Sequence, residues 1–212
     1  MPAMHRNVPN IITMARLVMA FGFFLVLNGY RYPAGPQWVL MLATVIFIIA
    51  AATDWLDGYL ARKWQVESTF GRIMDPFCDK VLVLGAFIYL SGTRFIDPVA
   101  VKQNEYMTMT TGIYPWMVVL MLARELLVTG IRGELEGQGV KFGANFWGKL
   151  KMILQSVAIP VILAIVWYNP RRSEEENLLH WLPDIIAYTV VFVTIMSGLP
   201  YVIDAVKSLA KK

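Results

Sequence analysis

Six apolar runs of nearly membrane-spanning length occupy most of this 212-residue chain. An α-helix rises 1.5 Å per residue, so roughly 20 apolar residues cross the hydrocarbon core of a bilayer. Apolar residues make up 57% of the chain and charged residues 16%, whereas soluble domains average roughly 45–50% and 25%. We therefore predict an all-α integral membrane protein with six transmembrane helices. The expected spans are residues 11–29, 37–61, 72–92, 113–133, 146–168 and 182–206.

Lysine and arginine are unevenly divided between the two sets of connecting segments. The set that includes both chain ends is richer, with residues such as Arg6, Arg62 and Lys141, than the set containing Arg31 and Arg94. Because basic loops stay in the cytoplasm, both termini are predicted to be cytoplasmic. No transit peptide precedes the first span, so a bacterial inner membrane is the expected location. We predict a single domain over residues 1–212, in contact with the lipid bilayer and without a nucleic-acid partner.

Four aspartates lie among these apolar runs, namely Asp54, Asp57, Asp75 and Asp79. A charged side chain at mid-bilayer costs about 2.5–3.5 kcal/mol on insertion scales, so four together require compensation. Asp54 and Asp57 are three residues apart, and Asp75 and Asp79 are four apart. On helices, the two members of each pair therefore share one face. Carboxylate oxygens are the preferred ligands of hard divalent cations. The spacing predicts that two helices bring the acids together around one or two metal ions.

The acids belong to the longer pattern D-x2-D-G-x2-A-R-x8-G-x3-D-x3-D, which begins at Asp54 and ends at Asp79. All of its fixed positions resemble the signature of the CDP-alcohol phosphotransferase family. The resemblance implies an integral-membrane enzyme of phospholipid synthesis, in which an alcohol displaces CMP from a CDP-linked lipid. It also implies a homodimer.

The resemblance assigns a role to each acid. It implies that Asp54, Asp57 and Asp75 bind Mg²⁺ or Mn²⁺, two ions that favour oxygen ligands. It further implies that Asp79 is the general base for the attacking hydroxyl and also a metal ligand. Cations bound to these acids would neutralise the charge of the pyrophosphate.

The other fixed positions are the expected CDP-diacylglycerol-binding residues. Gly58 permits close approach to the backbone, and the small side chain of Ala61 leaves room for a cytosine ring. Arg62 is suited to bidentate contact with phosphate. Gly71 is included with them, with close helix packing as its alternative role.

Basic residues elsewhere on the cytoplasmic side indicate an acceptor that carries its own phosphate. Arg124 lies inside an apolar span and requires a partner, and Arg132 follows two helical turns later on the same side. Glu125, next to Arg124, is expected to face elsewhere, so an anionic substrate or one of the aspartates is the expected partner of Arg124. With Lys149, these arginines form a predicted site for the acceptor phosphate, which glycerol 3-phosphate fits.

Three further segments resemble the phosphatidylglycerophosphate synthase subfamily. They are Arg124-Glu125 with Ile131-Arg132, the G-V-K and G-K-x-K stretches at 139–141 and 148–151, and the opening at residues 9–16. This resemblance implies transfer of a phosphatidyl group from CDP-diacylglycerol to sn-glycerol 3-phosphate, in a polar cavity that opens to the cytoplasm. Thr13 is counted with the acceptor-phosphate residues. Thr13 and Arg16 either line the entrance of the cavity or cap and anchor the first helix.

Three alternatives remain open at this point. The first is the same chemistry with another acceptor, such as inositol phosphate. The second is a cation transporter that uses the acids as an ion path, since intramembrane acids mark such paths. The acids lie near one membrane face without an acidic continuation toward the other, which argues against transport. The third is an inactive scaffold, which the intact motif argues against.

Overall fold

The computed structural model describes an all-helical chain over the ranges that follow. They are residues 4–64, 69–106, 108–137, 146–168 and 178–209. Within these ranges, the side chains that are not described belong to residues 4–9, 55–64, 69–70, 72–73, 136, 178–179 and 208–209. The described part contains no β-strand, only an isolated antiparallel bridge between Ile96 and Met109. The all-α prediction is confirmed for these residues.

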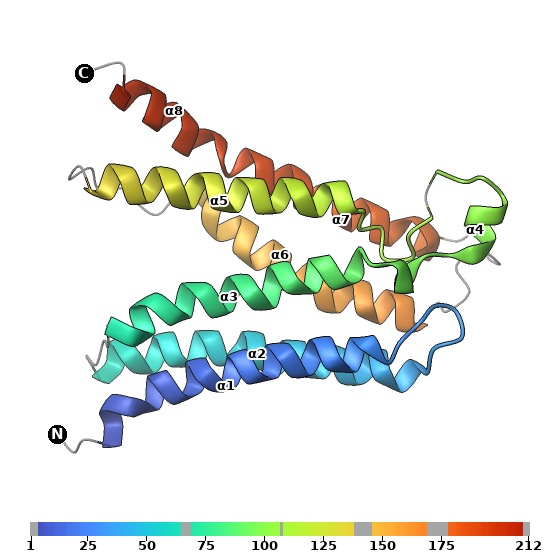
Figure 1. Ribbon diagram of the computed structural model, residues 1–212, viewed down its shortest axis with the longest axis horizontal. Helices are drawn as coiled ribbons and strands as arrows, with labels where there is room; N and C mark the ends of the chain where they lie inside the picture. Colours follow the sequence, from blue (N-terminus) through green and yellow to red (C-terminus); the bar gives the residue numbers. More distant parts are fainter. Residues whose placement is uncertain (1–3, 65–68, 107, 138–145, 169–177, 210–212) are drawn as a thin grey trace.

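Long helices run along the bundle in alternating directions (Figure 1). They are α1 (Met4–Asn28), α2 (Gln37–Trp64), α3 (Thr69–Leu90), α5 (Pro115–Gly137), α6 (Phe146–Tyr168) and α7 (Leu178–Met196), followed by α8 (Leu199–Leu209). The beginning of α1 and the end of α8 lie at one end of the bundle, together with the end of α2 and the beginning of α3. The opposite end carries two short elements, η1 (Thr93–Phe95) and α4 (Pro98–Lys102).

Four stretches of the described chain are long and apolar enough to cross a membrane. They are Asn10–Asn28, Gln37–Asp54, Phe146–Tyr168 and His180–Lys207. These stretches identify the chain as a membrane protein. Helices α3 and α5 match the other two predicted spans in position, but they carry the acids and basic residues of the motifs. The count of six spans thus stays a prediction.

The sixth predicted span, residues 182–206, lies within the candidate span His180–Lys207, but its helix is interrupted. Helix α7 ends at Met196 and α8 begins at Leu199, with a turn at Ser197 and Gly198 between them. Pro200 explains the interruption, because its ring lacks an N–H and clashes with the carbonyl four residues earlier. Gly198 also permits a close approach, since a Cβ there would lie 3.2 Å from Cγ of Arg124.

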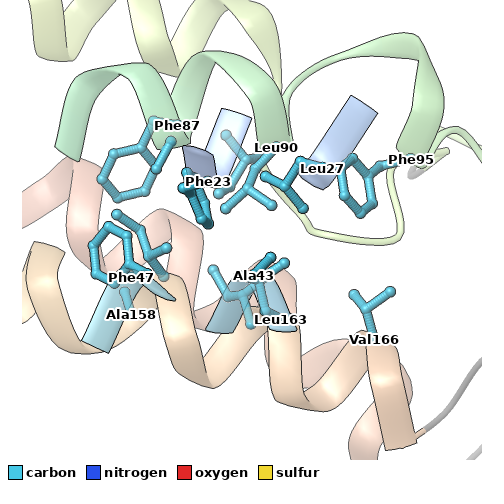
Figure 2. Packing of buried hydrophobic residues seen from close by; sticks show 14 of the residues in the cluster. Phe23, Leu27, Ala43, Phe47, Phe87, Leu90, Phe95, Ala158, Leu163 and Val166 are labelled. Carbon is cyan, nitrogen blue, oxygen red and sulfur yellow. The ribbon is translucent and has the colours of Figure 1, made fainter. Parts of the chain in front are cut away.

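One apolar core holds α1, α2, α3 and α6 together (Figure 2). Phe23 of α1, Phe47 of α2 and Phe87 of α3 are fully buried, and the rings of Phe23 and Phe47 lie 5.5 Å apart. Leu163 brings α6 into the same cluster. In lipid, van der Waals packing of this kind is a main source of helix association. The core therefore sets the positions of α1, α2 and α3 at the end where the motif acids lie.

Candidate active site

A buried arginine joins two of the motif acids. The side chain of Arg16 in α1 is 0% exposed, and its Nη1 donates to Oδ1 of Asp54 at 2.7 Å and to Oδ1 of Asp79 at 2.5 Å. The acids come from α2 and α3, so this contact connects the first three helices. Arg16 lines a cavity, and its ion pairs also attach α1 to α2 and α3, so the structure agrees with both roles considered for it.

Thr13 lies one helical turn before Arg16 on α1 and contacts a third acid. Its Oγ1 donates to Oδ1 of Asp75 at 2.5 Å, and the residue is 1% exposed. Thr13 was predicted to bind the acceptor phosphate, whereas the structure places its hydroxyl against a motif carboxylate. One face of α1 therefore meets the acids of both motif helices. The proposed role of Thr13 in acceptor binding remains a prediction.

The described motif acids supply the type of donor atom that a divalent cation prefers. Asp54 and Asp79 direct carboxylate oxygens at one positively charged nitrogen of Arg16, and hard oxygen donors of this kind suit Mg²⁺ or Mn²⁺. Among the side chains that the structure describes, no group of three or more acids, histidines or cysteines is close enough to hold a metal ion. The four-acid metal site therefore stays a prediction.

The remaining residues of the motif lie on α2 and α3. Asp57, Gly58, Ala61 and Arg62 lie on α2, but their side chains are outside the described residues. Gly71 is buried near the beginning of α3. Their predicted contacts with metal and CDP-diacylglycerol therefore stay predictions.

A cavity of about 620 Å³ connects the acids to the basic residues. Arg16, Asp54 and Asp79 line it from α1, α2 and α3, and the predicted acceptor residues line it from α5 and α6. These acceptor residues are Arg124, Arg132 and Lys149. The lining helices lie farther apart at the end of the bundle where α1 begins and α8 ends than at the opposite end (Figure 1). Two motifs that lie far apart in sequence thus share one space.

The partners of Arg124 differ from those predicted. Its Nη1 donates to Oε2 of Glu125 at 3.1 Å, and its Nη2 donates to the carbonyl oxygen of Ser197 at 3.1 Å. The prediction that Glu125 faces elsewhere was wrong. Adjacent residues leave a helix in different directions, but these two side chains are long enough to converge at the cavity that both line. The second contact places the guanidinium at the α7–α8 turn.

Two charged residues were missed as site residues. The side chain of Lys151 is 7% exposed, and its Nζ donates to Oε2 of Glu125. Lys80, which follows Asp79, lines the same cavity and donates to Oγ1 of Thr129 at 2.8 Å. An ionisable residue inside an apolar span is itself a signal of a functional site. That signal was present for Lys151, which belongs to the G-K-x-K stretch but was not among the predicted site residues.

Comparison with known proteins gives consistent results. Residues 6–197 match the sequence profile described as CDP-alcohol phosphatidyltransferase. A Bacillus subtilis (strain 168) protein named "CDP-diacylglycerol–glycerol-3-phosphate 3-phosphatidyltransferase" is 32% identical over 202 residues, covering 92% of this chain and 93% of its own. A Haemophilus influenzae protein of the same name is 30% identical over 207 residues, covering 96% of this chain and 95% of its own.

An Escherichia coli (strain K12) protein with that name is 32% identical over 167 residues, which cover 76% of this chain and 78% of its own. The profile match includes all four motif acids and extends through the basic residues of α5 and α6. The matched range therefore includes the acids and the basic residues that line the cavity. The chain belongs to the CDP-alcohol phosphatidyltransferase family.

Proposed function

We propose that this chain is an enzyme that transfers a phosphatidyl group from CDP-diacylglycerol to sn-glycerol 3-phosphate. The products are phosphatidylglycerol phosphate and CMP. The observation that carries this proposal is the single cavity lined by Asp54 and Asp79 on one side and by Arg124, Arg132 and Lys149 on the other. The names of the bacterial relatives support the choice of acceptor.

The two sides of the cavity perform different tasks in this reaction. The acceptor's 1-hydroxyl oxygen bonds to the phosphorus that carries diacylglycerol, the bond from that phosphorus to CMP breaks, and Asp79 takes the hydroxyl proton. Arg16 orients Asp79 through its contact with Oδ1. Arg124, Arg132 and Lys149 bind the acceptor phosphate with charge-assisted hydrogen bonds.

Asp54, Asp57, Asp75 and Asp79 are the proposed ligands of Mg²⁺ or Mn²⁺, which, when bound, would neutralise the pyrophosphate and polarise the phosphorus. The cavity is proposed to open to the cytoplasm, where both termini lie, in a bacterial inner membrane. The excess of basic residues at that end and the bacterial relatives support this orientation and location. A homodimer is part of the same proposal.

The purified protein is expected to select glycerol 3-phosphate among competing acceptors. In liposomes with radiolabelled CDP-diacylglycerol, we expect CMP release and phosphatidylglycerol phosphate with this acceptor, and at least about tenfold less product with glycerol, because glycerol lacks the phosphate that the basic cluster binds. Inositol phosphate and serine complete the panel. Preference for another alcohol would refute the acceptor assignment. Cation flux without CMP release would identify a transporter.

Removal of divalent cations is expected to stop the reaction. Dialysis against EDTA should lower CMP release at least about tenfold, because carboxylates alone repel the pyrophosphate. Addition of Mg²⁺ or Mn²⁺ should restore the rate, whereas addition of Na⁺ at equal ionic strength should not. A thermal melt of the dialysed protein controls for unfolding. Full activity at a metal content below one ion per hundred chains would contradict the proposed metal requirement.

A further inference from the structure

Glu125 stands at the centre of a charge cluster that connects three parts of the bundle. Its Oε2 accepts hydrogen bonds from Arg124 on α5 and from Lys151 on α6. Arg124 also donates to the carbonyl oxygen of Ser197 in the α7–α8 turn. The side chains of Glu125, Arg124 and Lys151 are 16%, 11% and 7% exposed. These three side chains form what we call the Glu125 cluster.

The Glu125 cluster keeps a net positive charge beside the cavity. Arg124 and Lys151 contribute two positive charges and Glu125 one negative charge, and all three residues line the cavity. Two cations this close, and this well buried, would repel each other without the carboxylate, since charges interact strongly where water is excluded. Glu125 therefore permits two cations to remain side by side.

Both cations retain hydrogen-bond donors for a ligand. A lysine ammonium has three N–H groups and an arginine guanidinium has five, and the contact with Oε2 uses one group from each. Arg124 uses a second group on the carbonyl oxygen of Ser197. The remaining donors of the two cations are available to an oxyanion in the cavity that both residues line. A phosphate monoester is the class of ligand that such an arrangement fits.

We propose that Glu125 is a positioning residue for the acceptor, which fixes Arg124 and Lys151 in the geometry that binds a phosphate monoester. Glu125 does not touch the reacting atoms in this proposal and acts through the two cations. The proposal rests on the function given above, since it concerns the same cavity and the same acceptor. It adds Glu125 and Lys151 to the residues that determine acceptor affinity.

The test is the steady-state kinetics of Glu125→Gln in the full-length protein in liposomes. Glutamine keeps the shape but loses the charge, so Arg124 and Lys151 lose their common anion. We expect KM for glycerol 3-phosphate to rise at least about tenfold, since hydrogen bonds to charged groups are the strong ones. KM for CDP-diacylglycerol should change less than about twofold. Glu125→Asp, which keeps the charge on a shorter side chain, should recover part of the acceptor affinity.

Thr194→Val supplies a matched structural control. Gln155 of α6 donates to Oγ1 of Thr194 of α7 at 3.1 Å, and Thr194 is 1% exposed. The substitution removes a buried contact between helices without changing any charge. Loss of a contact that only holds helices together should lower the melting temperature and change KM for glycerol 3-phosphate and KM for CDP-diacylglycerol by similar factors. Thr194→Val is expected to show that pattern, and Glu125→Gln the selective one.

A double-mutant cycle tests whether Glu125 acts through Lys151. Residues that act together give non-additive effects. Glu125→Gln should therefore raise KM for glycerol 3-phosphate by a smaller factor in a Lys151→Gln background than in the wild-type protein. Equal factors in the two backgrounds would overturn the proposed route through Lys151.

The other outcomes separate this inference from the proposed function. If the wild-type protein does not use glycerol 3-phosphate, the proposed function fails whatever the variants do. If the wild type is active and Glu125→Gln leaves KM for glycerol 3-phosphate unchanged, only the inference fails. Aggregation of both Glu125→Gln and Glu125→Asp would also overturn it, because Glu125 would then be required for folding.

Discussion

Asp79→Asn is expected to lower the rate of CMP release by about 10²–10⁴-fold, the usual contribution of a general base. Asparagine has nearly the same shape, and its carbonyl oxygen can still accept the hydrogen bond that Arg16 donates to Oδ1 of Asp79. The variant therefore removes the proton acceptor and the negative charge with little change to the packing of α3. The measurement is initial rate at saturating glycerol 3-phosphate and CDP-diacylglycerol.

Asp204→Asn is the matched control for this experiment. Asp204 is an exposed acid on α8, away from the contacts of Arg16. Its substitution should leave the rate within about twofold of the wild type, because changes at exposed positions away from the site usually alter stability by less than about 0.5 kcal/mol. An unchanged rate in Asp79→Asn, with correctly folded protein, would remove Asp79 from the proposed mechanism as the base.

Arg16→Met should destabilise the protein and inactivate it. Methionine fills similar space in a helix but leaves Asp54 and Asp79 without the cation that contacts both. Removing one partner of a buried ion pair costs about 3–5 kcal/mol. The carboxylates are 40% and 30% exposed, so we expect the lower end, about 3 kcal/mol, since solvent screens them partly. At roughly 2–4 °C per kcal/mol, the melting temperature should fall by about 6–12 °C.

Two further variants sharpen this result. Arg16→Lys keeps the charge but cannot reproduce the planar donor group, so it should recover more stability than activity. Arg31→Met removes an exposed arginine from the α1–α2 connection and should change the melting temperature by less than about 2 °C. An Arg16→Met protein that melts at the wild-type temperature would show that the contacts of Arg16 with the two acids contribute nothing to stability.

The helices of this fold were largely predictable because their signal is one of length and apolarity. The predicted segments at 37–61 and 146–168 correspond closely to α2 and α6, whose apolar runs are bounded by polar or turn-forming residues. The break between α7 and α8 was missed although its signal was present. Gly198 followed by Pro200 marks a helix end and a new start, but both lie in an apolar stretch that hydropathy alone treats as continuous.

The sequence predicted which residues form the site better than it predicted which of their side chains contact one another. Fixed spacing placed Asp54 and Asp79 on two helices that meet, and the structure brings them to one nitrogen of Arg16. No spacing rule connects Arg16 to its acids or Glu125 to Lys151, because those contacts join different helices and depend on how the helices pack. The separation of Glu125 and Lys151 by 26 positions carries no periodic signal.

The position of Arg16 in the chain has a consequence for the order in which the site is built. Ribosomes release α1 before α2 and α3, so the guanidinium enters the bilayer ahead of both carboxylates that it contacts. We therefore expect Asp54 to meet an existing counter-ion when α2 follows α1, and Asp79 to join when α3 follows. Each acid is thereby provided with a partner at the moment of insertion, when an isolated charge would be most costly.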